Sequence, residues 1–287
     1  MTPSALAPAK TVERFYDPEE GTATASAGSP PQQPARYVLQ PGLSMLSDAK
    51  GGVLLCLKPL LALRLNRPAT VLLTALRQPR SVADLAAQSE SGMAPAAINA
   101  FLDTLLRRRL LIWQPPVPAI WPKVSIIVPA RGRADATSRC VRSLLALDYP
   151  ADHREIIVVD DASTPPLSSV LSGLAITLLR QERNIGQSAA RNLAATVATG
   201  TVLAFTDNDC VVEPDWLRAL IPYLNDPDIA IIGGRVMAPS AQSAVAAFEA
   251  VRSPLDMGAF ATEVTPAATV SYLPTCNLLV RRDVLLA

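Results

Sequence analysis

Histidine and cysteine are scarce in this sequence of 287 residues, which holds one histidine and four cysteines. His153 lies in a polar stretch, and a single histidine argues against a histidine-dependent catalytic triad and a histidine-ligated zinc site. No two cysteines have the spacing of a metal finger, and scattered cysteines in a chain without a signal peptide are expected to be reduced thiols. They are Cys56, Cys140, Cys210 and Cys276.

Long hydrophobic runs are also missing. No stretch of about 18 uncharged apolar residues occurs, so we predict no transmembrane helix. Polar and charged residues interrupt the most apolar region, 53–76. The N-terminus lacks a basic segment followed by an apolar one, so no signal peptide is predicted. We therefore expect a cytoplasmic protein, with membrane association left open for a longer parent.

Charge is nearly balanced over the whole chain, at a formal net charge of +1, but it is unevenly distributed. Residues 36–120 carry ten Lys or Arg and four Asp or Glu, a net charge of +6. An acidic partner would be sought in this basic block. Because no Lys- or Arg-rich helix with interleaved aromatic residues is present, we do not expect a nucleic-acid partner.

Composition and periodicity divide the chain into a tail, two folded units and a linker. Residues 1–35 are rich in Pro, Ala, Ser, Thr and Gly and are predicted to be a disordered tail. Residues 36–114 are predicted to form the first folded unit. Residues 115–123 form a stiff, proline-rich linker. The second unit, 124–287, follows it.

The first unit is predicted to mix short strands and helices. Strands are expected at 37–39, 52–57 and 110–113, and helices at 69–76, 81–87 and 96–106, with Ser81 as an N-cap and Ile98, Leu102, Leu105 and Leu106 on one face. This order is that of a small winged-helix module. Such modules bind nucleic acid or add a peptide strand to an exposed sheet edge. The cluster Arg107-Arg108-Arg109 could contact an anionic partner, or it could be a solvated helix end.

The second unit alternates apolar strands with helices. This pattern predicts an α/β fold with a mostly parallel sheet and helices on both faces. The expected strands are 124–128, 155–159, 176–179, 201–205 and 229–232, and the expected helices are 134–147, 187–198 and 214–224.

The sharpest chemical signal is Asp207-Asn208-Asp209, directly after the apolar strand 201–205. In open α/β sheets, ligands bind at the carboxyl ends of the strands. Two carboxylates one residue apart suit Mg²⁺ or Mn²⁺, ions that often bind together with substrate phosphates. Taken alone, an Asp-x-Asp sequence could equally be a solvated turn.

Three further polar segments lie near the other strands. Pro129-Ala130-Arg131 follows the first strand, and Asp160-Asp161-Ala162-Ser163 follows the second. The stretch 184–192, Asn-Ile-Gly-Gln-Ser-Ala-Ala-Arg-Asn, runs from a loop into a helix. Their order and spacing are more specific than any one of them.

Together these segments resemble the family 2 glycosyltransferases of the GT-A fold. The resemblance covers residues 124–287 and implies a nucleotide-sugar donor, usually UDP-linked, together with Mn²⁺ or Mg²⁺. It implies that Asp209 holds the metal, where a Lewis acid neutralises the departing diphosphate. It also implies that Asp207 contacts the ribose or the metal, and that Asp161 contacts the uracil edge. Donor contacts are implied for Pro129, Arg131 and Arg191 as well.

Plainer explanations exist for some of these residues. Asp161 could form an Asx-turn, and Arg191 could be a surface charge on a helix. We expect Asp160 to be structural.

Another stretch, Phe248–Gly258 followed by Val270–Pro274, resembles the glycosyltransferases of the mycofactocin system. Those proteins carry an N-terminal module similar to the peptide-binding chaperones of peptide-cofactor pathways, which matches the unit at 36–114. The resemblance implies glucosylation of a peptide-derived redox cofactor.

The sequence departs from the family pattern at its C-terminal end. Inverting members place an acidic pair, which supplies the general base, beyond the segment that here spans Cys276–Asp283. No residue of this chain matches that base, and we interpret Asp283 as a helix N-cap. Two expectations follow: a truncated copy of a longer enzyme, or a nucleotide-sugar- or peptide-binding protein that lacks the base.

Overall fold

The structure is a computed structural model that describes residues 34–286, except 49, 58–59, 89–92, 239–242, 246, 249–252, 254 and 258–271. Nearly all of the predicted tail, 1–35, lies outside the described residues, and so does much of the stretch Phe248–Gly258 and Val270–Pro274. Within the described part of the chain, no helix is long and apolar enough to cross a membrane.

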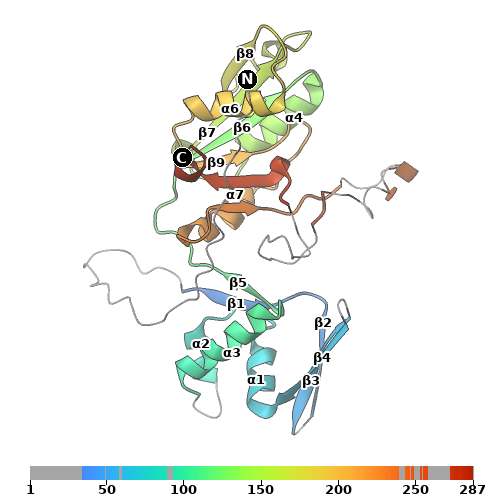
Figure 1. Ribbon diagram of the computed structural model, residues 1–287, viewed down its shortest axis with the longest axis vertical. Coiled ribbons are helices and arrows are strands. Elements are labelled where there is room, and N and C mark those ends of the chain that lie inside the picture. Colours follow the sequence, from blue (N-terminus) through green and yellow to red (C-terminus); the bar gives the residue numbers. More distant parts are fainter. Residues whose placement is uncertain are drawn as a thin grey trace, which may run out of the picture. The chain divides into compact units, whose positions relative to one another are not determined.

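The first unit contains two small antiparallel sheets and three helices (Figure 1). One sheet pairs the first strand with the last, so that Tyr37 faces Trp113. The other is a three-stranded meander in the order β2-β3-β4. The elements are β1 Arg36–Leu39, β2 Leu43–Asp48, β3 Gly51–Leu57, β4 Leu60–Asn66, α1 Arg67–Ala75, α2 Val82–Gln88, α3 Pro95–Arg107 and β5 Leu111–Gln114.

The predicted helices and three strands of this unit are confirmed, and the structure adds two strands, β2 and β4. Leucine and alanine dominate β4, and both favour helices over strands. Pairing of both strands with β3 overrides this local preference. The interpretation of this unit as a winged helix that binds peptide stays a prediction.

Leucine and isoleucine side chains from the three helices and from strands β3, β4 and β5 form the core of this unit. Ile98, Leu102 and Leu105 of α3 are buried, whereas Leu106 is only partly buried. The predicted cap at Ser81 is confirmed, because its Oγ accepts a hydrogen bond from the Asp84 N–H at 3.1 Å. The Asp84 carboxylate accepts one from the Ser81 N–H in return, and these bonds lower the pKa of Asp84.

Aromatic contacts attach the end of the linker to the second unit. The rings of Trp121 and Tyr149 meet edge to face at 5.4 Å, and the Tyr149 hydroxyl donates to the Pro122 carbonyl oxygen at 2.6 Å. The single histidine also contacts the linker, with its Nδ1 2.5 Å from the carbonyl oxygen of Trp121. His153 thus has a structural partner here.

The second unit is built on a six-stranded sheet in the order β10-β11-β9-β6-β7-β8. Neighbours β9, β6, β7 and β8 are parallel, and β11 is antiparallel to both of its neighbours. The elements are β6 Val124–Ala130, α4 Ala134–Leu145, η1 Ala151–His153, β7 Arg154–Asp161, α5 Ser168–Leu171, β8 Thr177–Gln181, α6 Gln187–Val197, β9 Val202–Phe205, α7 Trp216–Leu220, η2 Ile221–Asn225, β10 Ile231–Gly233, η3 Thr275–Asn277, β11 Leu278–Arg281 and α9 Arg282–Leu285.

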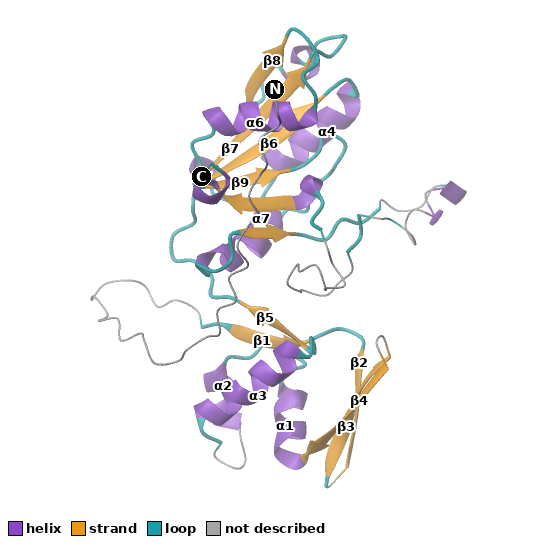
Figure 2. Cartoon of the chain, viewed as in Figure 1, coloured by secondary structure: helices purple, strands orange, loops and turns teal. Residues whose placement is uncertain are grey.

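Helices cover both faces of this sheet (Figure 2), as predicted. On one face, larger side chains of α4 and α7, such as Val141, Leu144 and Trp216, pack against the even-numbered residues of β6 and β7. On the other face, Ala190 and Ala194 of α6 contribute to a separate core with Ile127 of β6, and residues of this small size let a helix lie close to the strands.

Two predictions about the second unit are corrected. The predicted helix 214–224 is a short helix, α7, followed by the 3₁₀ turn η2. Asp283 is not an N-cap but lies in the first turn of α9, whose cap is Arg281. The reason is that pairing of β11 with β9 continues to Arg281, and the Arg282 N–H donates to the Thr201 carbonyl, so the helix begins at Arg282.

Candidate functional site

A cavity of about 290 Å³ opens where the parallel strands β6, β7 and β9 end. Loops and helix starts from four segments of the sequence meet there, because the carboxyl ends of parallel strands lie on one edge of a sheet. The residues that line it are Pro129, Ala130, Arg131, Arg133, Asp161, Gln187, Ala190, Asp207, Asn208 and Asp209.

The alternation of side chains along β7 separates the adjacent residues Asp160 and Asp161. Ile156 and Val158 face the core beneath α4, while Ile157 and Val159 face the core beneath α6. Since successive side chains point to opposite faces, Asp160 continues the first set and Asp161 the second. The two carboxylates therefore have different partners.

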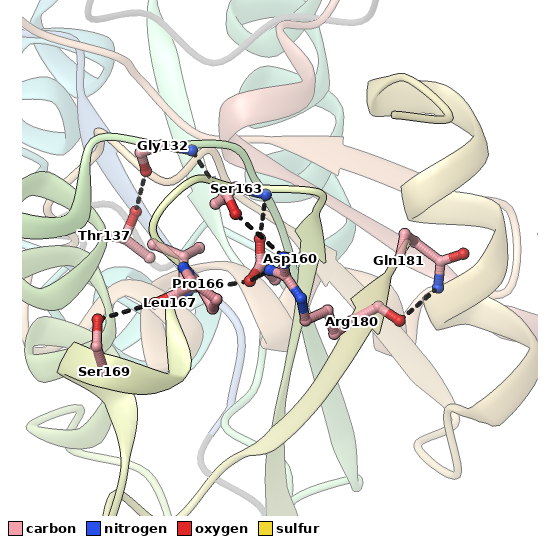
Figure 3. Close-up of polar contacts among 9 residues, drawn as sticks. All are labelled: Gly132, Thr137, Asp160, Ser163, Pro166, Leu167, Ser169, Arg180 and Gln181. Atoms are coloured by element: carbon pink, nitrogen blue, oxygen red, sulfur yellow. Dashed lines mark hydrogen bonds and ion pairs between the residues drawn. The ribbon is translucent and has the colours of Figure 1, made fainter. Parts of the chain in front are cut away.

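Asp160 is fully buried and holds the loop that follows β7 (Figure 3). Its carboxylate accepts hydrogen bonds from the N–H groups of Ser163 and Leu167, at 2.9 and 3.0 Å, and from Arg180 at 2.5 Å. Burial raises the pKa of Asp160, but these bonds outweigh it and lower the pKa overall. The expectation that Asp160 is structural agrees with these contacts.

This network reaches the cavity through Ser163. The Ser163 Oγ accepts a hydrogen bond from the Gly132 N–H at 2.8 Å, as Figure 3 shows. Gly132 lies between Arg131 and Arg133, which both line the cavity. Asp160 thus positions, through Ser163, the loop that carries both arginines.

Asp161 anchors the loop that leads into α6. Its two carboxylate oxygens accept hydrogen bonds from the N–H groups of Ile185 and Gly186, at 2.7 and 3.0 Å. Gly186 has a φ of +84°, a conformation that glycine adopts without steric cost. The start of α6, whose N-terminal dipole favours anions, thereby lies against the cavity.

The turn after β9 is held from both faces of the sheet. The Asp207 carboxylate binds Arg191 of α6, with Nη2 and Oδ1 2.6 Å apart. The Asn208 side-chain amide donates to Thr137 of α4 at 2.8 Å. Neighbouring side chains of this turn therefore find partners on helices that cover opposite faces of the sheet.

A buried thiol supports the same turn. The Cys140 Sγ donates to the Asp207 carbonyl oxygen at 3.4 Å. Burial, followed by the nearby Cys210 and Asp209, raises the pKa of Cys140 to about 12, so its thiol keeps the proton at neutral pH. Among the described side chains, Cys140, Cys210 and Cys276 are free thiols.

Asp209 lies at the exposed side of the cavity and pairs with Arg133. The Arg133 Nη1 is 2.5 Å from the Asp209 Oδ2, and the side chains are 67% and 46% exposed, respectively. Sequence reasoning missed Arg133, although it follows the predicted Arg131 by two residues in the same loop. The lining residues Gln187 and Asn208 lie in segments that the sequence analysis singled out, but neither was predicted as a site residue.

Five of the six predicted site residues, Pro129, Arg131, Asp161, Asp207 and Asp209, line this one cavity. The sixth, Arg191, binds Asp207 and is only 12% exposed. That Arg191 contacts a ligand directly stays a prediction.

The donor atoms suit a divalent cation that shares its coordination with a ligand. Asp207 and Asp209 each use one carboxylate oxygen for an arginine, and among the described residues the other oxygen accepts no hydrogen bond. No group of three His, Cys, Asp or Glu side chains forms a metal site within the described ranges. A hard cation here would need further oxygen ligands, such as phosphates.

The formal charge of the cavity lining also favours a divalent cation together with an anionic ligand. Its lining holds two arginines and three aspartates, a net formal charge of −1. A divalent cation would change this to +1, which suits an anionic diphosphate.

Comparison with protein families settles the class. A family model described as glycosyl transferase family 2 matches residues 125–286, more than half of the chain. The chain belongs to glycosyl transferase family 2. The predicted fold class, an α/β GT-A fold whose mostly parallel sheet carries helices on both faces, is confirmed.

Curated glycosyltransferases match more than half of the chain. Over 172 residues the chain is 32% identical to the pre-mycofactocin glycosyltransferase of Mycobacterium tuberculosis, covering 58% of this chain and 35% of that protein. Over 170 residues it is 26% identical to glycosyltransferase AglE of Haloferax volcanii, covering 57% and 54%. The aligned region thus spans about a third to a half of the length of these relatives.

A solved structure that resembles the chain is the mannosyltransferase PcManGT from Pyrobaculum calidifontis in complex with GDP-Man and Mn²⁺. It shares 24% sequence identity with a TM-score of 0.45, and the match covers 67% of this chain and 55% of that chain.

Proposed function

We propose that the chain is an inverting glycosyltransferase that takes its sugar from a nucleotide-sugar such as UDP-glucose. The observation that carries the proposal is the cavity at the ends of β6, β7 and β9. It gathers Asp161, Asp207 and Asp209, from two segments of a family 2 domain, beside two arginines and the start of α6.

The contacts of each residue support a distinct role. Asp209, the more exposed aspartate of the turn, would hold Mn²⁺ or Mg²⁺, with Asp207 as a second ligand or ribose contact. When bound, the cation supplies Lewis-acid stabilisation of the departing diphosphate. Asp161 and Pro129 would border the uracil, and Arg131 and Arg191 would add positive charge toward the nucleotide.

The acceptor is proposed to be a peptide-derived redox cofactor of the mycofactocin type, and the sugar glucose. Support comes from the 32% identity to a pre-mycofactocin glycosyltransferase over 172 residues. The first unit, with its exposed edge strand β2, would bind the peptide portion by strand addition.

Isothermal titration calorimetry of UDP in the presence of Mn²⁺ tests donor binding. We expect saturable binding that Asp209→Ala weakens at least tenfold, a loss of about 1.4 kcal/mol. The matched control is Asp215→Ala, which removes the same charge from an exposed position outside the cavity lining. This variant should bind UDP as tightly as the wild type does. Absence of binding by the wild type, or undiminished binding by Asp209→Ala, would refute the proposal.

A second candidate function is nucleotide-sugar binding without transfer. It is favoured by one observation: the three carboxylates that line the cavity are all assigned to the donor or metal, which leaves none there as general base. Incubation with UDP-glucose and a mycofactocin-type precursor, followed by mass spectrometry, separates the two. A hexose adduct supports transfer, and binding without any turnover supports the second candidate.

A further inference from the structure

The two aspartates that flank Asn208 are paired to arginines in different ways. Arg191 and Asp207 are 12% and 26% exposed, so water screens this pair weakly. Arg133 and Asp209 are 67% and 46% exposed. Exposed ion pairs contribute only about 0–1 kcal/mol, so the second pair can separate at little cost.

The backbone around Arg133 is fixed although its side chain is exposed. Gly132 and Arg133 have φ values of +62° and +49°, and a non-glycine residue rarely adopts the second. Hydrogen bonds hold this conformation: the Gly132 N–H donates to Ser163, and the Thr137 hydroxyl donates to the Arg133 carbonyl oxygen at 3.1 Å. The loop therefore presents the Arg133 guanidinium toward the cavity from a defined point.

Thr137 also joins this loop to the turn after β9. Its hydroxyl accepts a hydrogen bond from the Asn208 side chain while it donates to the backbone of Arg133. The backbone that carries Arg133 and the turn that carries Asp209 are thereby fixed relative to each other. Only the two side chains, not the two backbones, need to move for the ion pair to open.

We propose that Arg133 is an exchangeable counter-ion of Asp209. When the divalent cation binds to Asp209, the Arg133 guanidinium leaves this carboxylate and binds the diphosphate of the donor. This inference rests on the proposed function of the cavity. A guanidinium and a metal ion both carry positive charge, so beside the same Asp209 carboxylate they repel each other and compete, even though they can use different oxygens. A displaced guanidinium still faces the cavity that Arg133 lines, where a diphosphate offers it two oxygens in the geometry that arginine prefers.

This exchange couples the two ligands. Without nucleotide, the metal must compete with Arg133 and binds weakly. With nucleotide, the arginine gains a new partner as it leaves Asp209, so metal and nucleotide each strengthen binding of the other. Arg133 is thus a positioning residue that makes the site accept the metal and the diphosphate together.

The exchange predicts that replacing Arg133 strengthens the binding of the metal alone and weakens the binding of the nucleotide. In Arg133→Gln, Mn²⁺ alone should bind about fivefold more tightly, which is the upper range for the release of an exposed ion pair. The electron paramagnetic resonance signal of the free ion measures this affinity. In the same variant, UDP at saturating Mn²⁺ should bind about tenfold more weakly, because a charge-assisted contact is lost. Calorimetry measures this affinity.

Two further variants serve as references. Arg139→Gln removes the same charge from an exposed position of α4 outside the cavity lining, and neither affinity should change. Arg133→Lys keeps the charge without the planar fork, so its affinity for Mn²⁺ alone should stay near the wild-type value.

The outcomes separate this inference from the proposed function. If the wild type binds UDP with Mn²⁺ but Arg133→Gln binds Mn²⁺ no more tightly than Arg139→Gln does, the exchange is refuted while the proposed function stands. If Mn²⁺ alone binds more tightly but UDP binds no more weakly, the transfer of Arg133 to the diphosphate is refuted. If the wild type does not bind UDP with Mn²⁺, the proposed function itself fails.

Discussion

Two aspartate–arginine clusters lie at the same edge of the sheet, and they differ in what surrounds the carboxylates. At the end of β7, Asp160 is fully buried and accepts hydrogen bonds from two backbone N–H groups and from Arg180. After β9, Asp207 and Asp209 are partly exposed and each is bound to one arginine. The sequence pattern, an acid pair at a strand end, is nearly the same in both places.

The difference teaches that burial and the number of occupied oxygen positions decide what a carboxylate can do. Both oxygens of Asp160 are used within the protein, so no position faces a ligand. Asp207 and Asp209 each keep one oxygen that no described residue occupies. One cluster therefore stabilises the fold, and the other is available for a cation.

Asp160→Asn is the strongest test of this difference. The amide keeps the size but cannot accept at both atoms, and it leaves two N–H donors and Arg180 incompletely paired. Loss of these contacts to a fully buried carboxylate should lower the free energy of unfolding by about 3 kcal/mol, although the Arg180 side chain itself is 41% exposed. Urea denaturation followed by circular dichroism measures this change. A loss below about 1 kcal/mol would show that the cluster is not the structural one.

The pH dependence of stability should have its origin in acids that are hydrogen-bonded within the fold outside the cavity lining. Asp160 has a lowered pKa, and so does Glu155, because hydrogen bonds from Ser125 and Thr199 outweigh its burial. Each acid binds its proton more weakly in the folded chain, so each stabilises the fold above its unfolded pKa of about 4. This contribution is lost as the pH falls through the lower folded pKa.

We therefore expect the midpoint of urea denaturation to fall as the pH is lowered from about 5 to about 3, and to fall less steeply in Asp160→Asn. Parallel titrations of the two proteins measure both slopes. Identical slopes would assign the acid sensitivity to other groups.

Much of this architecture follows from the sequence for an identifiable reason. Strands β6, β7 and β9 are apolar on both faces, so their identity and parallel arrangement could be predicted without knowing their neighbours. Five of the six predicted site residues line one cavity because the carboxyl ends of these strands meet there.

The remainder depends on contacts between distant residues. Strand β11 could not be predicted, because Leu278–Arg281 becomes a strand only by pairing with β9. Arg133 was missed for a similar reason: its sequence neighbours do not show that its backbone turns left-handed and directs it to Asp209, which is 76 residues away.

Arg191→Ala should have a smaller effect on stability than Asp160→Asn. It leaves Asp207, which is 26% exposed, without its arginine, and water can replace part of the lost interaction. We expect a loss of about 1–2 kcal/mol in urea denaturation, together with weaker binding of UDP and Mn²⁺ because the turn is less well held. Arg183→Ala, at an exposed position of the loop before α6, is the control. Equal effects of the two variants would contradict a supporting role for Arg191.

Asp209→Asn should have the smallest effect on stability and yet a large one on binding. Its pair with Arg133 is exposed, so we expect the free energy of unfolding to change by at most about 0.5 kcal/mol. Binding of UDP with Mn²⁺ should fall at least tenfold, because an amide oxygen is a poor substitute for a charged ligand of the cation. Denaturation and calorimetry on one preparation give both values. A loss of stability above about 1.5 kcal/mol would show that the Arg133–Asp209 pair is part of the structural framework, and it could then not open at the low cost that exchange with a metal requires.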